Sequence, residues 1–199
     1  MMDQESLFAA GKLPRELLPW KSKQGHLNAM LYNDDAFLFD THSMASMHLV
    51  NEEGFGGFTI MDDSDRELSR HLQAVWLAEG NVLKTGLGFG CFVRMALLNP
   101  RVKHIDVIEK DPDIAEHFGC QFDNNDRVTI HVCDAFKFDF ENYQWDLAWH
   151  DIYCDGNDGL ARLHFQLMIK YRKVAKIQSA WAIDRWARKL LTKAGVRTF

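Results

Sequence analysis

The sequence lacks long apolar runs: no stretch approaches the roughly 18 consecutive apolar residues that a transmembrane helix needs. The opening segment, MMDQESLFAAGK, lacks the basic start and apolar core of a signal peptide. Cysteine is scarce, and no two of the 4 cysteines form a C-x-x-C pair, which argues against a disulfide framework or a zinc site. We therefore expect a cytoplasmic protein with reduced thiols and no membrane segment.

Excess positive charge is also missing. The net charge is −5 and the isoelectric point is near 6.0, which argues against nonspecific nucleic-acid binding by the whole chain. We interpret the two basic segments, residues 170–176 and 185–193, as solvated helix faces. Nucleic acid is therefore not an expected partner.

Two further observations argue against particular kinds of site. No G-x-S-x-G elbow is present, so a serine-hydrolase site of that kind is excluded. Asp151, Asp155 and Asp158 offer carboxylates of the kind that bind Mg²⁺, but a loop of solvated acids is the simpler interpretation. We expect no metal site.

The composition is that of an ordinary globular protein, with 199 residues, 47% hydrophobic and 26% charged. We divide the chain into an N-terminal extension, residues 1–63, and a main domain, residues 64–199. Two apolar segments around the polar turn at 33–35 predict a β-hairpin in the extension. A capping box that starts at Ser64 predicts a helix to about Glu79. Its expected apolar stripe is Leu68, Leu72, Val75 and Trp76.

The most informative stretch is residues 81–114, NVLKTGLGFGCFVRMALLNPRVKHIDVIEKDPDI. It predicts a strand at 81–85, a glycine turn, a helix at 92–98 and a second strand at 104–108 that is followed by Glu109. Glycines let the main chain approach a ligand, and a helix N-terminus presents free N–H groups. A carboxylate after the second strand can accept hydrogen bonds from both hydroxyls of a ribose. This βαβ unit therefore predicts a nucleoside-bearing cofactor.

The rest of the main domain predicts two more helical segments and two more strands. Asp111-Pro112 begins a helix to about Phe118, and strands follow at 128–133 and 147–151. Residues 160–194 have helical apolar spacing, with a break expected near 171–174 because a single helix of that length would span roughly 50 Å. We expect no strand after the fourth.

The G-x-G-x-G spacing of Gly86, Gly88 and Gly90 resembles motif I of the class I S-adenosylmethionine (SAM) methyltransferases. Asp134, in VTIHVCDAF, resembles that family's acidic residue after the third strand, which contacts the adenine amino group. The segment WDLAWHDIY resembles its fourth strand, which places an acidic or polar residue beside the reactive sulfonium.

The resemblance spans residues 81–153 and implies an α/β fold, a Rossmann-like sheet with helices on both faces, and SAM as cofactor. The cofactor-binding residues that it implies are Gly86, Leu87, Gly88, Gly90, Glu109, Lys110, Asp134, Ala135 and Asp151.

Two departures from the family accompany this resemblance. Lys84 stands where the family often has an acid that faces the methionine amino group. The family also has about three more strands, so the C-terminal edge of this sheet should be truncated and finished by helices. Because an open sheet edge and its apolar faces need cover, we expect a homo-oligomer.

The predicted reactive cluster is His150, Asp151 and Tyr153, at the end of the fourth strand. Asp151 is a candidate general base for an acceptor amine or hydroxyl, or an electrostatic partner of the sulfonium. His150 should point to the opposite face because side chains alternate along a strand, so one of the two is structural. Tyr153 is placed to stack on the acceptor or to cover the pocket.

The chain is also similar to the spermidine synthase (aminopropyltransferase) branch of the same superfamily, over residues 27–165. The similar segments are AFLFDTHS in the hairpin, NPRVKHIDVIEKDPDI at the second strand, and YQWDLAWHDIY, in which Asp151 takes the place of the catalytic aspartate. The glycine loop departs from that branch, because Leu87 and Phe89 stand where an acid is expected, and Ile152-Tyr153 follows the aspartate in place of its usual pair.

The leading hypothesis is a SAM-dependent methyltransferase that acts on a small-molecule acceptor. The alternatives are aminopropyl transfer or lyase cleavage at the same sulfonium site, and a non-catalytic SAM-binding partner subunit.

Overall fold

A parallel sheet of five strands forms the centre of the main domain, β5 (Gly80–Thr85), β6 (Val102–Glu109), β7 (Val128–Val132), β8 (Trp145–His150) and β9 (Ala175–Ala180). The computed structural model describes residues 30–32, 36–41, 44–49, 59–62, 65–152, 157–181 and 183–199. The strand order is β7-β6-β5-β8-β9, so the chain first builds outward from β5 and then returns to its other side. Ligands of such sheets bind outside the carboxyl ends of the strands at the point of reversal, here between β5 and β8.

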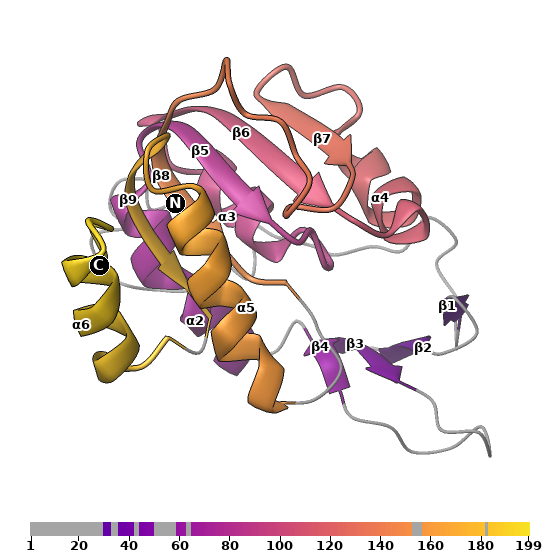
Figure 1. The fold of residues 1–199 in the computed structure, drawn as a ribbon. Coiled ribbons are helices and arrows are strands. Elements are labelled where there is room, and N and C mark those ends of the chain that lie inside the picture. Colours follow the sequence, from indigo (N-terminus) through magenta and orange to yellow (C-terminus); the bar gives the residue numbers. More distant parts are fainter. Residues whose placement is uncertain are drawn as a thin grey trace.

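Helices cover both faces of this sheet (Figure 1). One face packs against α2 (Asp65–Leu77), α3 (Cys91–Leu97) and α4 (Pro112–Gly119), and a short helical turn, η2 (Cys120–Phe122), follows α4. The other face packs against α5 (Asn157–Lys170) and against aromatic side chains of the loop between β7 and β8. The helix α6 (Arg185–Lys193) packs beside α5.

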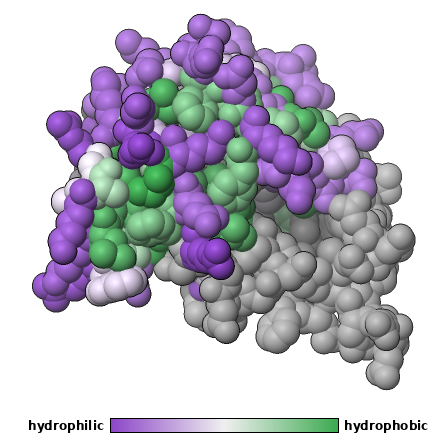
Figure 2. Space-filling view, in the orientation of Figure 1, coloured by the Kyte–Doolittle hydropathy of each residue, from purple (hydrophilic) through white to green (hydrophobic). Residues whose placement is uncertain are grey.

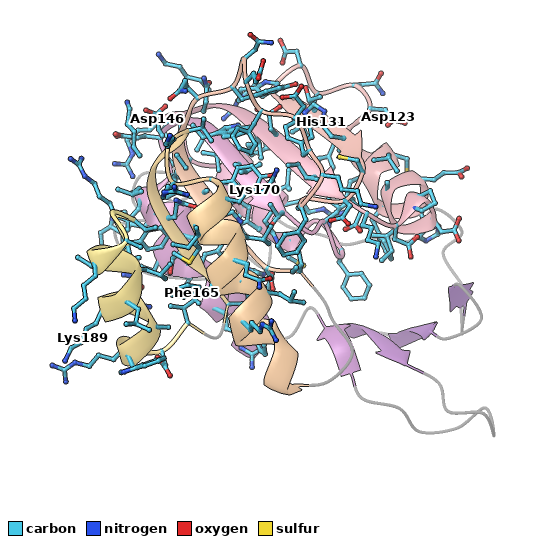
Figure 3. The ribbon with its side chains drawn as sticks, in the orientation of Figure 1. Asp123, His131, Asp146, Phe165, Lys170 and Lys189 are labelled. Carbon is cyan, nitrogen blue, oxygen red and sulfur yellow. The ribbon has the colours of Figure 1, made fainter. Side chains whose placement is uncertain are left out.

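The contact between α5 and α6 is apolar, with hydrophilic residues on the outer sides of both helices (Figure 2). Phe165 lies in this contact, whereas Lys189 points away from the body of the protein (Figure 3). Lys170, at the end of α5, donates to the Phe138 carbonyl at 3.0 Å and so ties the helix to the β7–β8 loop.

The N-terminal extension contains an antiparallel sheet of four strands, β1 (Met30–Tyr32), β2 (Ala36–Thr41), β3 (Met44–Leu49) and β4 (Thr59–Asp62). The predicted hairpin is confirmed, because β1 pairs with β2 across the turn. The sequence did not reveal β3 and β4. The boundary between residues 63 and 64 falls between β4 and α2 and stays a prediction.

The helix predicted from the capping box is confirmed as α2, but the prediction of its apolar stripe was wrong at Trp76. Trp76 is 55% exposed, and the buried face is completed instead by His71 and Ala74. Asn99 closes the C-terminal end of α2, where its amide donates to the carbonyls of Val75 and Ala78 at 2.9 and 2.8 Å. These bonds satisfy carbonyl groups that a helix end leaves without partners.

The prediction that the sheet ends at its fourth strand was wrong. The expected break near 171–174 is confirmed as a turn, but residues 175–180 then form β9, which pairs with β8. The spacing of apolar residues in this segment suits a helix as well as a strand. Pairing with β8 decides between them, and that partner lies about 30 residues away along the chain.

The outer edge of β9 is also different from the one expected. A parallel bridge joins Gln178 to Thr198, and the Gln178 N–H donates to the Arg197 carbonyl at 2.8 Å. The edge is therefore finished by extended chain as well as by α6. In the described part of the chain, no helix is long and apolar enough to cross a membrane.

Candidate functional site

The glycine turn between β5 and α3 lies against the end of β8. Gly86 has φ 79°, a left-handed conformation that side-chain-bearing residues rarely adopt. A Cβ at Gly86 would lie 2.2 Å from the Asp151 carbonyl oxygen, so only glycine permits this approach. Gly90 has φ 76°, and a Cβ there would meet side chains rather than main chain, at 2.8 Å from Gln121 Nε2 and 2.9 Å from the Phe122 ring. The third glycine, Gly88, has φ 54°.

Glu109 ties the glycine turn to the end of β6. Its Oε2 accepts a hydrogen bond from the Leu87 N–H at 2.7 Å, and its Oε1 accepts one from the Asp111 N–H at 2.9 Å. Each carboxylate oxygen has a second lone pair, so Glu109 can accept two further hydrogen bonds. The Leu87 side chain is buried in the core, so Leu87 contributes its main chain to the turn. Lys110, the next residue after Glu109, is exposed.

Asp134 lies beside Glu109, at the carboxyl ends of the strands. The N–H of Cys133 donates to the Glu109 carbonyl at 2.8 Å, which places the ends of β6 and β7 side by side. One oxygen of Asp134, Oδ1, accepts from the Phe136 N–H at 2.8 Å. Ala135 is buried, and its carbonyl accepts from the Tyr171 hydroxyl at 2.8 Å. Two carboxylates therefore stand at neighbouring strand ends beside the glycine turn.

Lys84 forms an ion pair with Asp151 at the other side of the turn. Its side chain is 1% exposed, and Nζ lies 3.1 Å from Asp151 Oδ2. The ammonium also donates to the carbonyls of Thr85 and Asp151, at 3.2 and 3.4 Å. Three oxygens therefore hold the three protons of this buried cation.

The ion pair keeps Asp151 ionised. Burial acts to raise the pKa of Asp151, but the charge of Lys84, then that of His71, and the hydrogen bond from Lys84 outweigh it. The pKa is consequently below its ordinary value, although the side chain is only 14% exposed. Such a carboxylate is a weak base and a strong partner for a cation.

His150 lies on the opposite face of the sheet from Asp151, as the alternation of side chains predicted. Its Nδ1 is 3.2 Å from Thr85 Oγ1 and its Nε2 is 2.9 Å from Gln178 Oε1. Burial lowers its pKa to about 3, although the Gln178 bond acts to raise it. Both ring nitrogens are engaged inside the sheet, so we leave His150 out of the proposed site. Tyr153 lies outside the described residues.

Two buried histidines that the sequence did not single out surround the ion pair. His71, from α2, is fully buried, and neither ring nitrogen has a hydrogen-bond partner among the described residues. Burial lowers its pKa to about 4, against the nearby charge of Asp151, which acts to raise it. Its ring meets those of Phe92 and Trp149 edge-on, with centroids 6.0 Å away in both cases.

The second of these, His164, comes from α5. Its Nε2 accepts from the Ile152 N–H at 3.1 Å. Among the described residues its Nδ1 has no hydrogen bond of normal geometry, although the charge of Asp151 and the Trp181 carbonyl act to raise the pKa of His164. Burial has the larger effect and holds that pKa below the ordinary value. The only sequence signal for either residue was a histidine at a core position of a helix, which is more often structural than functional. Within the described residues, no cluster of three or more ligating side chains could hold a metal ion.

Comparison with known proteins identifies the fold. Neither a protein-family model nor a curated protein matches the sequence. A candidate SAM-dependent methyltransferase from Streptococcus mutans has a TM-score of 0.51 at 12% identity, over 81% of this chain and 46% of that protein. A second candidate methyltransferase, crystallised with S-adenosylhomocysteine (SAH), has a TM-score of 0.52 at 14% identity, over 85% and 48%. The chain thus spans just under half the length of each.

At this level of identity the likeness establishes the fold alone. The parallel five-stranded sheet with its helices is the Rossmann-like fold of methyltransferases, which confirms the predicted fold class. The similarity to spermidine synthase stays a prediction.

Proposed function

We propose that this chain is a SAM-dependent methyltransferase that acts on a small-molecule acceptor. The observation that carries the proposal is Glu109, which holds the glycine turn through the Leu87 N–H and keeps two lone pairs for a ribose. The solved structures support the same cofactor class, because one is described as SAM-dependent and the other contains SAH. The net charge of −5 supports a small acceptor over a nucleic acid.

Each strand end would hold one part of the cofactor. Asp134 would accept from the adenine amino group and Glu109 from the ribose hydroxyls. The sulfonium would lie past the end of β5, near Asp151. Because its pKa is below the ordinary value, the Asp151 carboxylate is a weak base, and it would favour the positive sulfonium electrostatically rather than remove a proton. The acceptor would attack the methyl carbon in line and release SAH, with positioning supplying most of the rate.

Binding of SAH tests the cofactor assignment. Glu109→Ala removes the ribose acceptor and one anchor of the turn, so it should weaken SAH binding by roughly 1–3 kcal/mol, the cost of an unsatisfied buried polar contact. Isothermal titration calorimetry measures this, and Glu116→Ala, an exposed acid on α4, is the matched control. Equal SAH affinity in the two variants would remove Glu109 from the ribose site.

The reaction is tested with SAM labelled on its methyl group and offered to separated cell fractions. Label in the small-molecule fraction supports the proposal, whereas label in RNA or protein overturns the acceptor class. Methylthioadenosine formed without any acceptor would indicate a lyase. SAH binding with no transfer to any fraction would indicate a non-catalytic binding subunit.

A further inference from the structure

Two buried side chains of the α5 region reach toward the carboxyl ends of the strands. The helix α5 follows β8 and leads back to the start of β9, so its N-terminal end lies at the carboxyl edge of the sheet (Figure 1). His164 and Tyr171 are seven positions apart, on one face of the helix, and both are 0% exposed. Tyr171 directly follows α5 and continues its last turn, because its N–H donates to the Leu167 carbonyl at 2.9 Å. Since helical side chains tilt toward the N-terminus, both side chains lean toward the site.

His164 holds the main chain that directly follows Asp151. Its Nε2 accepts a hydrogen bond from the Ile152 N–H at 3.1 Å. The glycine turn packs on this same main chain, because a Cβ at Gly86 would lie 2.2 Å from the Asp151 carbonyl oxygen and 3.3 Å from Ile152 Cα. A shift of the chain at this point would therefore move both the Asp151 carboxylate and the support of the turn.

Tyr171 holds the main chain that directly follows Asp134. Its hydroxyl donates to the Ala135 carbonyl at 2.8 Å, and Ala135 is itself buried. Asp134 Oδ1 accepts from the Phe136 N–H at 2.8 Å, so the carboxylate is tied to the segment that the tyrosine fixes. Loss of the hydroxyl would leave the Ala135 carbonyl without this partner, which favours movement of the segment.

The two acids that these side chains support lie at strand ends that are not neighbours. Asp134 follows β7 and Asp151 follows β8, with β6 and β5 between them. The proposed function places Asp134 at the adenine and Asp151 at the sulfonium. On the basis of that function, we infer that His164 and Tyr171 are positioning residues that set the separation of Asp134 and Asp151 to the length of the cofactor. Neither side chain touches the cofactor, and each acts through the main chain one residue after an acid.

Calorimetry with SAH and with adenosine tests this inference, because adenosine lacks the part of SAH that would lie near Asp151. Tyr171→Phe removes only the hydroxyl and should weaken the binding of both ligands by the same factor, about three- to tenfold. His164→Leu removes the acceptor of the Ile152 N–H, so it should weaken SAH binding by about three- to tenfold and adenosine binding less. His164→Gln offers an amide oxygen to the same N–H and should restore the affinity for SAH.

Lys170→Met is the matched control. It removes a hydrogen bond from α5 to the same β7–β8 loop, at the Phe138 carbonyl, four residues beyond Asp134, and should leave both affinities unchanged. An equal loss of affinity in this control, or unchanged SAH affinity in Tyr171→Phe and His164→Leu, overturns the inference. If His164→Leu does not fold, the comparison of Tyr171→Phe with Lys170→Met decides. If the unmodified chain binds neither ligand, the proposed function itself is wrong and the inference falls with it.

Discussion

At the scale of single residues, the ion pair of Lys84 and Asp151 has to offset the free-energy cost of burying a charged lysine. Placing a lysine in the central strand of a parallel sheet costs desolvation free energy that only good geometry can offset. Here Nζ has three oxygen partners within 3.4 Å. The structure therefore explains how a lysine is tolerated next to the glycine turn, where the sequence alone marked it as a departure.

Asp151→Asn should destabilise the protein by about 2–4 kcal/mol, because it leaves the buried lysine without a counter-ion. Adding Lys84→Met to this variant should recover most of that loss. Urea unfolding of the two single variants and the double variant gives the coupling free energy. Additive effects would mean that the two side chains do not depend on each other.

The buried histidines make stability dependent on pH. The pKa of His71 is lowered from 6.5 to about 4 and that of His150 from 6.5 to about 3, in both cases chiefly by burial. Between those values and 6.5 the unfolded chain binds more protons than the folded one, so stability is full above pH 6.5 and is lost as the pH falls toward 4. The lowered pKa of Asp151 adds a further loss only below its ordinary value of 3.8.

We expect the free energy of unfolding to fall between pH 6.5 and 4 by up to about 1.4 kcal/mol per pH unit for each of these two histidines. His71→Phe should remove its share of this slope, since the site already packs against the rings of Phe92 and Trp149. Urea unfolding at half-unit pH steps measures the slope. A flat profile across this range would show that the histidines are not buried as neutral rings.

At the scale of elements, the turn from β5 to α3 depends on backbone geometry more than on side chains. Gly86 and Gly195 share nearly the same left-handed conformation, with φ 79° and 81°. They differ in their surroundings, because a Cβ at Gly86 meets the Asp151 main chain while one at Gly195 meets no described residue within 4 Å beyond its chain neighbours. Alanine substitutions at these two glycines therefore distinguish the cost of backbone strain from the cost of steric contact.

Gly195→Ala should cost about 1–2 kcal/mol, the strain of the left-handed conformation alone. Gly86→Ala should cost more than that, because β5 or β8 must also shift, and it should abolish SAH binding. Thermal unfolding and calorimetry measure both effects. Equal costs at the two positions would show that the contact between the turn and Asp151 is loose.

At the scale of the whole molecule, β9 and α6 form the edge where further strands would extend the sheet. Thr198 bridges this edge at Gln178, and α6 presents Trp186, which is 68% exposed. Large exposed aromatic side chains near a sheet edge favour association. The expected homo-oligomer stays a prediction, but its basis changes, because the sheet does not end at the fourth strand.

Light scattering at micromolar concentration should give a mass above the 23.0 kDa of one chain. Trp186→Glu should shift the mass toward that of the monomer without changing SAH affinity, since α6 lies away from the glycine turn. Trp76→Glu, at an exposed tryptophan on α2, is the matched control and should leave the mass unchanged. A monomeric mass for the unmodified chain would contradict the prediction.

The sequence by itself determined the βαβ unit, its glycine turn and the residues Glu109 and Asp134. These follow from short-range rules, because apolar periodicity, turn residues and the end of a strand are all set by neighbours in the chain. The opposite orientation of His150 and Asp151 was predicted for the same reason, since alternation is a local property of strands.

Only the tertiary structure decided the rest. Residues 175–180 become β9 because β8 supplies their hydrogen bonds, and their own apolar spacing does not distinguish strand from helix. Lys84 and Asp151 meet because parallel pairing aligns the ends of β5 and β8, although 67 positions separate them in the sequence. His71 reaches the same pair from α2, through helix packing on the sheet. A local pattern carries no information about which distant charge will compensate a buried one, so the charge balance of the site became visible only in the folded chain.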